Sequence, residues 1–408
     1  MLRQGLPLEA AIGRATAGLD KPSDRALAHA IAGAVLRHAT DLDRLIDSAM
    51  KKPLPEDAKA RLVIRIALAQ MLVLNTPPHA AIATSLPLLD SGPRRLAHGV
   101  IGTLSRQHAT LPDRPSLPDA VALRWQKNWG VEMVAAASDA WAKQPPLDLT
   151  LKQAADARAW AARLGATSLT EGHLRLPSQS VPALPGFEEG DWWVQDLAAS
   201  LPARLLGPGK GEVLDLCAAP GGKTMQLASA GWTVTAVDSS ASRLTRLGEN
   251  LGRTGLRAET VVADAMKWTP PKKYDAILLD APCSATGIFR RHPDVLYRVT
   301  PKHIAQMAEL QAALLRRALD WLKPGGTFVY AVCSLEPEEG ERQIERLLGE
   351  RPDLSVDPVR TEELPAGLSP TVAGFVRTLP GDLAAEGSVD GFFVARLKQF
   401  DDRVSASA

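Results

Sequence analysis

Two cysteines of this chain stand where a thiol can take part in a reaction. Cys283 lies in DAPCSATG (280–287), which follows the apolar stretch YDAILL, and Cys333 lies in AVCSLEPEEGE (331–341), which follows GTFVY. Both stretches predict strands, so both thiols are expected at carboxyl ends of strands, where α/β sheets bind ligands. Free cysteines often fill apolar cores, but the polar, turn-forming neighbours of these two make burial in such a core harder.

Thiols at such a site suit methyl transfer to a pyrimidine carbon. Carbon-5 of the ring is a poor nucleophile until a thiolate adds at carbon-6 and creates an enamine. The attacking thiol must ionise near neutral pH, which requires an electropositive position or a helix N-terminus. An acid at ring nitrogen-3 would assist the addition, and Asp280 is placed for this role if its pKa is raised. A second cysteine can serve when the carbon-5 proton is removed and the enzyme leaves.

The stretch VLDLCAAPGGKT (213–224) predicts a nucleotide-type binding loop. Its first four residues indicate a buried strand, the middle residues a turn, and Lys223 and Thr224 the start of a helix. The free backbone N–H groups of a helix N-terminus suit a carboxylate or a phosphate. A phosphate-binding P-loop would need a glycine where this chain has Cys217.

S-adenosylmethionine is the competing ligand for this loop, and two further acids favour it. Its ribose calls for an acid at the end of the next strand, about 20 residues on. Asp238 ends TVTAVD, and Asp264 ends TVVAD, where it can accept from an adenine amino group. A single acid at a strand end is often only a helix N-cap. Three of them at one sheet edge, Asp238, Asp264 and Asp280, favour the cofactor.

The elements that would position these residues alternate between strand and helix from about residue 206. The strands are predicted near 212–216, 233–238, 258–263, 274–280 and 327–332, and the helices near 223–230, 240–252 and 301–322. This alternation predicts a mainly parallel sheet with helices on both faces. Pro324-Gly325-Gly326 should stop the last helix, Ser239 should cap the second, and 391–397 should add an antiparallel edge strand.

The front of the chain predicts a different architecture. Apolar spacings of three and four indicate helices near 11–16, 24–50, 56–74, 79–90 and 92–107, with a break at Pro87. Asp24 and Glu56 are expected in first turns. A proline-containing linker and one helix follow over 110–135, and 145–205 mixes short strands with a helix. Trp192 and Trp193 either stack a base or pack at a domain junction.

Composition restricts the class of protein. The chain has 408 residues, 45% of them hydrophobic and 23% charged, which is ordinary for a globular protein. It has neither an apolar run of about 18 residues nor an apolar signal core at its start, so we expect no membrane span and a cytoplasmic location. Three cysteines predict no disulfide framework, and the scattered histidines predict no metal site. The net charge of +1 does not by itself indicate nucleic acid, although residues 1–110 hold 14 Lys and Arg against 9 Asp and Glu.

Several motifs together resemble one family. CAAPGGKT, AVDSS, VVADA, ILLDAPCSATGIFRRHPD, AVCSLEPEEGE and DGFFVARL are similar to those of the RNA cytosine-5 methyltransferases of the RsmB/Fmu (Nol/Nop/Sun) family. The stretch from LDRLIDSAM to NTPPHAAI resembles the NusB-like domain of its bacterial 16S rRNA enzymes. The resemblance implies an all-α NusB-like RNA-binding domain (1–110), a linker with a small α/β subdomain (111–205), a Rossmann-like S-adenosylmethionine-dependent methyltransferase domain (206–400) and a disordered tail (401–408).

The resemblance also implies roles for individual residues. Cys333 maps to the nucleophile, Cys283 to the cysteine that aids product release, and Asp280 to the acid before Pro-Cys. The cofactor would be held by Cys217, Ala218, Ala219, Pro220, Gly221, Gly222, Lys223, Asp238, Asp264 and Asp280. The implied partner is 16S rRNA, unassembled or early in assembly, bound by a monomer without a metal. Val332 replaces the threonine usual before the nucleophile, and Ser239-Ser240 lack a further acid that often follows Asp238.

Other interpretations are open at this stage. A DNA cytosine-5 methyltransferase would use Cys283 as its nucleophile, and a P-loop hydrolase would bind a nucleotide with magnesium at the same loop. A non-catalytic RNA-binding assembly factor would leave both cysteines idle. Arg290, Arg291 and His292 follow the Pro-Cys turn, and we expect them to contact RNA phosphates beside a flipped base.

Overall fold

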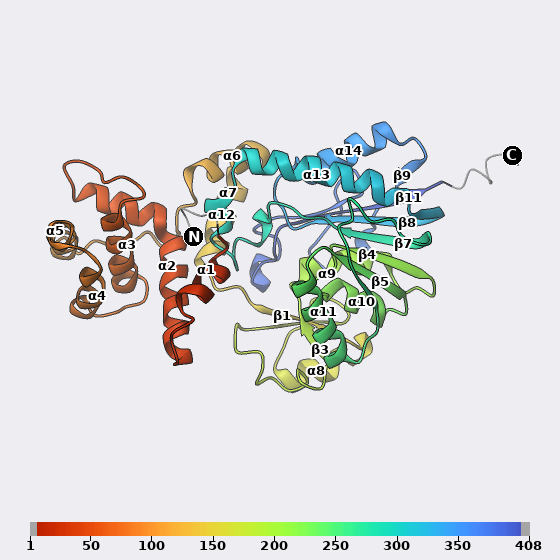
Figure 1. Ribbon diagram of the computed structural model, residues 1–408, viewed down its shortest axis with the longest axis horizontal. Coiled ribbons are helices and arrows are strands. Elements are labelled where there is room, and N and C mark those ends of the chain that lie inside the picture. Colours follow the sequence, from red (N-terminus) through yellow and green to blue (C-terminus); the bar gives the residue numbers. More distant parts are fainter. Residues whose placement is uncertain (1–5, 401–408) are drawn as a thin grey trace, which may run out of the picture. The chain divides into compact units, whose positions relative to one another are not determined.

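The computed structural model describes residues 6–400 and divides into two compact units (Figure 1). Among the described residues, one unit comprises 6–143 with 289–298, and the other comprises 144–288 with 299–400. The predicted disordered tail at 401–408 lies outside the described residues. Within the described part of the chain, no helix is both long and apolar enough to cross a membrane.

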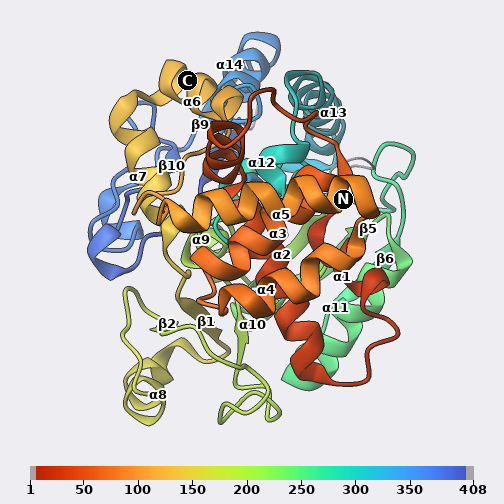
Figure 2. The same cartoon turned by 90° about the vertical axis from the view of Figure 1, so that its left-hand side faces the viewer.

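The first unit is helical, as predicted. Its front helices are α1 (Leu8–Ala15), α2 (Pro22–Ser48), α3 (Lys59–Leu72), α4 (Pro78–Ser85) and α5 (Ser91–Arg106). Helix α3 is central because it contacts α2, α4 and α5 (Figure 2). Its side chains at Val63, Ile64 and Leu68 are buried in the apolar core that these helices share. Pro87 lies in a 3₁₀ turn, which confirms the predicted break.

Two details of this unit differ from the prediction. Helix α3 begins at Lys59, so Glu56 precedes its first turn, whereas Asp24 does lie in the first turn of α2. Residues 110–135 begin two helices rather than one: α6 (Asp119–Trp129) and α7 (Val131–Ala142). Gly130 separates them because its backbone, at φ 87°, is in a region that helices do not use. The segment 289–298 adds the short helix α12 (Val295–Arg298).

The second unit is built on an eight-stranded sheet, which confirms the predicted α/β class. Its strands are β4 (Glu212–Leu216), β5 (Thr233–Asp238), β6 (Glu259–Val262), β7 (Tyr274–Asp280), β8 (Leu322–Val332), β9 (Leu354–Val356), β10 (Val376–Thr378) and β11 (Phe392–Gln399). The order is β10-β11-β8-β7-β4-β5-β6, with β9 paired to β11. Strands β4 to β8 are parallel, so β4, β5, β7 and β8 end at one edge of the sheet together with β6.

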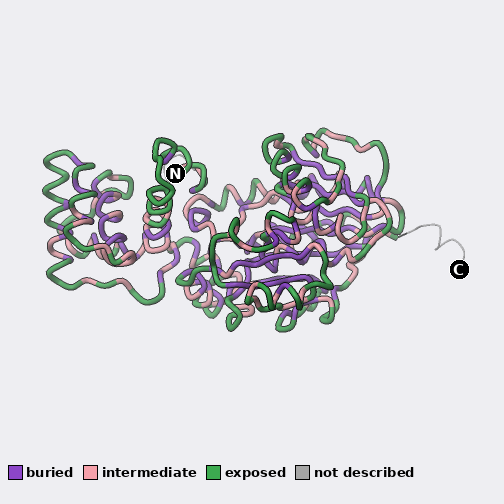
Figure 3. Tube along the Cα trace, turned by 90° about the horizontal axis from the view of Figure 1, so that it is seen from below, coloured by how far each residue is buried: buried purple, intermediate pink, exposed green. Residues whose placement is uncertain are grey.

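Helices cover both faces of this sheet (Figure 1). Helices α13 (Pro301–Leu319) and α14 (Glu341–Glu350) pack on the face that carries Ile277, Leu279 and Phe328. Helices α9 (Leu197–Leu206), α10 (Gly222–Ser229) and α11 (Ala241–Thr254) lie against the other face. The central strands are accordingly almost wholly buried (Figure 3). Strands buried on both faces read as continuous apolar runs, which is why the sequence revealed them.

Three local predictions for the sheet were wrong. Helix α13 ends at Leu319, and Pro324-Gly325-Gly326 lies inside β8, where the pairing with β7 shifts between Tyr274 and Ala276. The prolyl-glycyl stretch therefore forms an irregularity in a strand rather than a helix stop. Strand β11 is antiparallel as expected but is not an edge, since β9 and β10 pair with its outer side. The N-cap of α11 is Ser240, whose hydroxyl accepts from Arg243 N, rather than Ser239.

A small sheet of order β2-β1-β3 accompanies the large one. Its strands are β1 (Leu147–Leu151), β2 (His173–Leu176) and β3 (Trp192–Val194), and helix α8 (Ala157–Leu164) packs on it. Trp192 is completely buried and Trp193 is 3% exposed. The packing interpretation of this pair is therefore confirmed, and a base cannot stack on Trp192 in this conformation.

Candidate active site

The loop between β4 and α10 requires backbone shapes that few residues adopt. Cys217 has φ 60° and Gly221 has φ 106°. A Cβ atom on Gly221 would come within 2.8 Å of Leu247 Cγ, so only glycine fits this close approach of the loop to α11. Helix α10 then begins at Gly222, and its first N–H groups are presented at the carboxyl edge of the sheet.

Asp215 is a buried acid of this loop that the sequence analysis did not single out. Its side chain is fully buried in β4, and Thr224 Oγ1 donates to its Oδ2 over 2.5 Å. Burial raises the pKa of Asp215 to about 7, and the Thr224 hydrogen bond opposes that shift. An aspartate within the apolar run VLDL was the available signal. It joins the end of β4 to the first turn of α10 and thereby fixes the loop between them.

The two acids predicted for the cofactor end neighbouring strands. Asp238 ends β5, and its Oδ2 accepts from Ala219 N at 3.2 Å and lies 3.2 Å from Nη1 of Arg243. The side chain of Asp238 is buried, whereas that of Asp264, which follows β6, is half-exposed. Asp264 Oδ1 accepts a hydrogen bond from Met266 N. The pairing of Asp238 with Val262 brings both acids to one edge of the sheet.

Lys223 and Asp280 form an ion pair beside the loop. Lys223 Nζ lies 2.8 Å from Asp280 Oδ2, and the same ammonium is 5.4 Å from the centre of the Phe392 ring. Burial lowers the pKa of Lys223, but the charge and hydrogen bond of Asp280 and the charge of Cys333 outweigh it, so the pKa is raised. A permanent ammonium therefore stands near both Asp280 and the thiol of Cys333.

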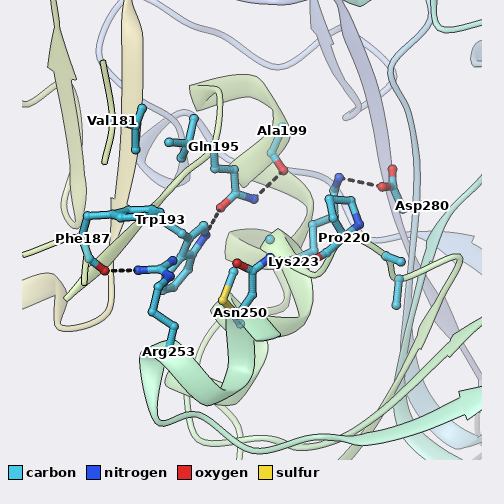
Figure 4. Close-up of a pocket in the computed structure, with 15 residues that line it drawn as sticks. Val181, Phe187, Trp193, Gln195, Ala199, Pro220, Lys223, Asn250, Arg253 and Asp280 are labelled. Atoms are coloured by element: carbon cyan, nitrogen blue, oxygen red, sulfur yellow. Dashed lines mark hydrogen bonds and ion pairs between the residues drawn. The ribbon is translucent and has the colours of Figure 1, made fainter. Parts of the chain in front are cut away.

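A cavity of about 490 Å³ adjoins the loop (Figure 4). Ala218, Ala219, Pro220, Gly222 and Lys223 line it from the loop, and Phe187, Trp193, Gln195, Asn250, Arg253 and Asp280 are among its other lining residues. In Figure 4 the Phe187–Arg253 contact lies at the left of the view and the Lys223–Asp280 pair at the right. Asp238, Asp264 and the cysteines are not among the lining residues. The cavity therefore reaches the loop and the ion pair but not the whole predicted site.

The structure brings the two predicted thiols together. Cys283 follows β7 and Cys333 follows β8, and their sulfur atoms are 3.5 Å apart. Gly287 N donates to Cys333 O, so the two turns are also joined through the backbone. The hydrogen bond with Cys333, burial and the charges of Cys333 and Glu339 all raise the pKa of Cys283. Cys283 therefore retains its proton more firmly than an ordinary cysteine.

Cys217 is unsuited to act as a nucleophile. Burial, with added repulsion from Asp280 and Asp238, raises the pKa of its thiol to about 12. A thiol with this pKa is almost entirely protonated at neutral pH. Cys217 therefore lies in the loop, at φ 60°, as a protonated thiol.

The basic stretch after the Pro-Cys turn is placed differently from the prediction. Arg290 is 2% exposed within the helical unit, and Arg37 donates to its backbone oxygen over 2.9 Å. A contact of Arg290 with RNA phosphates is wrong for this conformation, because phosphates need an accessible guanidinium. Arg291 and His292 are half-buried, and burial lowers the pKa of His292. Their contact with RNA stays a prediction.

The residues at this edge of the sheet suit S-adenosylmethionine in their chemistry. Gly221 leaves the close-packed turn that a Cβ would fill, α10 presents backbone donors, and Asp238 and Asp264 supply acceptors on the adjacent strands. The first glycine of a P-loop is absent, because Cys217 occupies its position. This donor set suits a ligand with a carboxylate, a ribose and an adenine.

Comparison with known proteins agrees with this arrangement. Residues 203–398 match the family model described as 16S rRNA methyltransferase RsmB/F, and residues 3–98 match the NusB family. The chain is 37% identical to the ribosomal RNA small subunit methyltransferase B of Cronobacter sakazakii, over 92% of this chain and 90% of that protein.

Solved structures share the fold. A methyltransferase homolog protein from Pyrococcus horikoshii is 27% identical, with a TM-score of 0.58 over 69% of this chain and 95% of that one. NSun6 from Pyrococcus horikoshii, solved with SFG, is 20% identical, with a TM-score of 0.60 over 70% of this chain and 98% of that one.

Proposed function

Because this chain belongs to the RsmB/F family of 16S rRNA methyltransferases, which depend on S-adenosylmethionine, we propose that it methylates carbon-5 of a cytosine in 16S rRNA. The observation that carries this proposal is the pair of thiols 3.5 Å apart at the ends of β7 and β8. Methyl transfer to nitrogen or oxygen needs no thiol, whereas carbon-5 of a pyrimidine needs a nucleophile at carbon-6.

Cys333 is the nucleophile in this proposal. The charge of Cys333 contributes to the raised pKa of Lys223, so the Lys223 ammonium and the Cys333 sulfur interact electrostatically. The hydrogen bond with Cys333, burial and the charge of Glu339 raise the pKa of Cys283. In this proposal Cys333 attacks carbon-6, while Cys283 keeps a proton beside it.

The Lys223–Asp280 pair supports the ring as the thiolate adds. Negative charge develops toward nitrogen-3 at this stage, and a fixed positive charge or hydrogen-bond donor next to it lowers the barrier. The sequence alone suggested a protonated Asp280, but the ion pair gives another route, because the Lys223 ammonium donates a hydrogen bond to the carboxylate. Asp280 would hold the cytosine edge while Lys223 supplies the positive charge.

The cofactor would be held by the loop from Cys217 to Lys223, with Asp238 at its ribose and Asp264 at its adenine. When bound, S-adenosylmethionine supplies an electrophilic methyl group for carbon-5. Because the two sulfur atoms are 3.5 Å apart, Cys283 would lie next to the Cys333–carbon-6 bond. Cys283 would give its proton to the departing Cys333 sulfur and take the carbon-5 proton in its place, as the carbon-5–carbon-6 double bond re-forms. This sequence regenerates both thiols.

Trapping of a covalent complex tests these roles. Cys283→Ala should accumulate an RNA–protein adduct that survives denaturing electrophoresis, because Cys333 still attacks but release is slow. Cys283→Ala combined with Cys333→Ala is the control and should form none. An adduct in Cys333→Ala instead, with none in Cys283→Ala, would reverse the roles and favour the arrangement of a DNA cytosine-5 methyltransferase.

A further inference from the structure

A buried carboxylate connects the two cysteine turns. Glu339 is fully buried in the turn that follows β8. Its Oε1 accepts from Ser284 N at 2.8 Å, and its Oε2 accepts from the hydroxyls of Ser284 and Ser334. Ser284 directly follows Cys283, and Ser334 directly follows Cys333. One carboxylate therefore binds the residue next to each thiol.

Neighbouring groups hold this carboxylate in place. Gln311 Nε2 of α13 donates to Glu339 Oε1 at 3.1 Å and to Pro282 O at 2.8 Å. Tyr330 Oη donates to the backbone oxygen of Glu339 over 2.6 Å. All of these donors are neutral hydroxyl, amide or backbone groups. Burying a charge on such partners costs several kcal/mol in general, so a carboxylate at this position calls for an explanation other than packing.

The charge of Glu339 distinguishes the two thiols. Cys283 faces three titratable groups: Cys333, Glu339 and the phenol of Tyr330. Cys333 makes the largest contribution to the raised pKa of Cys283, burial the second, and the charge of Glu339 adds to both. Cys333, by contrast, is near the Lys223 ammonium. Glu339 thus acts on Cys283, and Lys223 interacts with Cys333.

We propose that Glu339 is a positioning residue that fastens the turns of Cys283 and Cys333 to each other and keeps Cys283 a neutral thiol beside the Cys333 sulfur. The proposal rests on the proposed function only in taking Cys333 as the nucleophile. A merely structural carboxylate would hold the turns without affecting which thiol ionises, and that difference can be measured.

The ionisation of Cys283 is measured most simply where no second thiol lies beside it. In a Cys333→Ala background, alkylation of Cys283 by iodoacetamide is followed from pH 6 to 10 by mass spectrometry of its peptide. Glu339→Gln should shift the alkylation midpoint to lower pH and raise the rate at pH 7.5 about tenfold, because less of the thiol is then held in its protonated form. Glu338→Gln is the matched control, because that neighbouring carboxylate is partly exposed and pairs with Arg342. The control should not shift the midpoint.

An unchanged midpoint in a folded Glu339→Gln protein would overturn the charge effect, whatever the methylation assay gives. This readout does not require methyl transfer, since the Cys333→Ala background is expected to be inactive. Normal methylation by Cys333→Ala would instead contradict the proposed function and would leave the alkylation result intact. The two failures are therefore distinguishable.

A second variant covers the case in which Glu339→Gln does not fold. Ser284→Ala combined with Ser334→Ala keeps the carboxylate but removes the hydroxyls that bind it. With Cys333 present, this double variant should lower kcat at least about tenfold with KM for RNA and cofactor little changed, and alkylation of Cys283 should stay slow. A normal kcat would overturn the positioning role.

Discussion

At the scale of the residue, the two thiols have different charged neighbours. Cys283 and Cys333 are 3.5 Å apart, and Cys283 faces Glu339 while Cys333 interacts with the Lys223 ammonium. The proposed reaction would use this difference to give the same residue type two roles. The sequence showed both cysteines and Asp280, but it did not show the Lys223–Asp280 contact, because those residues are 57 positions apart.

Asp215 permits a prediction about pH. Its pKa is about 7 in the fold, against 3.8 for the ordinary carboxyl, so the folded state keeps its proton over a range in which the unfolded state loses it. Its contribution to stability is fully present below pH 4 and is lost as the pH rises through 7. Asparagine does not titrate, so the Asp215→Asn protein should not lose this stability as the pH rises.

We therefore expect the difference in the free energy of unfolding, Asp215→Asn minus parent, to increase as the pH rises from 5 to 8. The increase should be a few kcal/mol at most, since about three pKa units correspond to about 4 kcal/mol. Urea unfolding at both pH values measures it, with the exposed Asp156→Asn as control. A difference between Asp215→Asn and parent that does not vary with pH would contradict the role assigned to burial.

At the scale of the element, the parallel strands collect the site at one edge. Strands β4, β5 and β7 were predictable from their apolar residues, and Asp238 and Asp280, which end β5 and β7, marked the edge in advance. The irregularity at Pro324-Gly325-Gly326 was not predictable, since the same residues ordinarily end helices and only the pairing of β8 with β7 decides between the two. The interior position of β11 was not predictable either. Its outer neighbours β9 and β10 are only three residues each, which is too short for a recognisable strand pattern.

The glycine that bounds the cofactor loop offers a test at this scale. Gly221→Ala should weaken S-adenosylmethionine binding at least about tenfold and lower stability by about 1–3 kcal/mol, because its φ of 106° and its contact with Leu247 both resist a Cβ. Isothermal calorimetry and thermal unfolding measure the two effects. Gly248→Ala is the control within α11, where an added Cβ meets nothing within 4 Å. Equal affinity in the two variants would contradict the role of the loop.

At the scale of the whole molecule, the chain combines a helical unit with a methyltransferase sheet, and each was visible in the period of its apolar residues. Helix spacing of three and four identified the front helices, and alternating strands and helices identified the sheet. The assignment of the segment 289–298 to the helical unit was not visible, because it returns there from the middle of the sheet's sequence. Arg290 lies in this segment and is buried, so it does not contribute to an accessible basic surface.

The most direct test of the account is the methylation of 16S rRNA by the whole protein with one sulfur atom removed. Purified parent protein and Cys333→Ala are incubated with protein-free 16S rRNA and S-adenosylmethionine, and 5-methylcytosine is mapped by bisulfite sequencing. We expect the parent to methylate a cytosine and Cys333→Ala to be slower by at least about a thousandfold, since covalent addition at carbon-6 is lost. Methylation by Cys333→Ala at the rate of the parent would contradict the account.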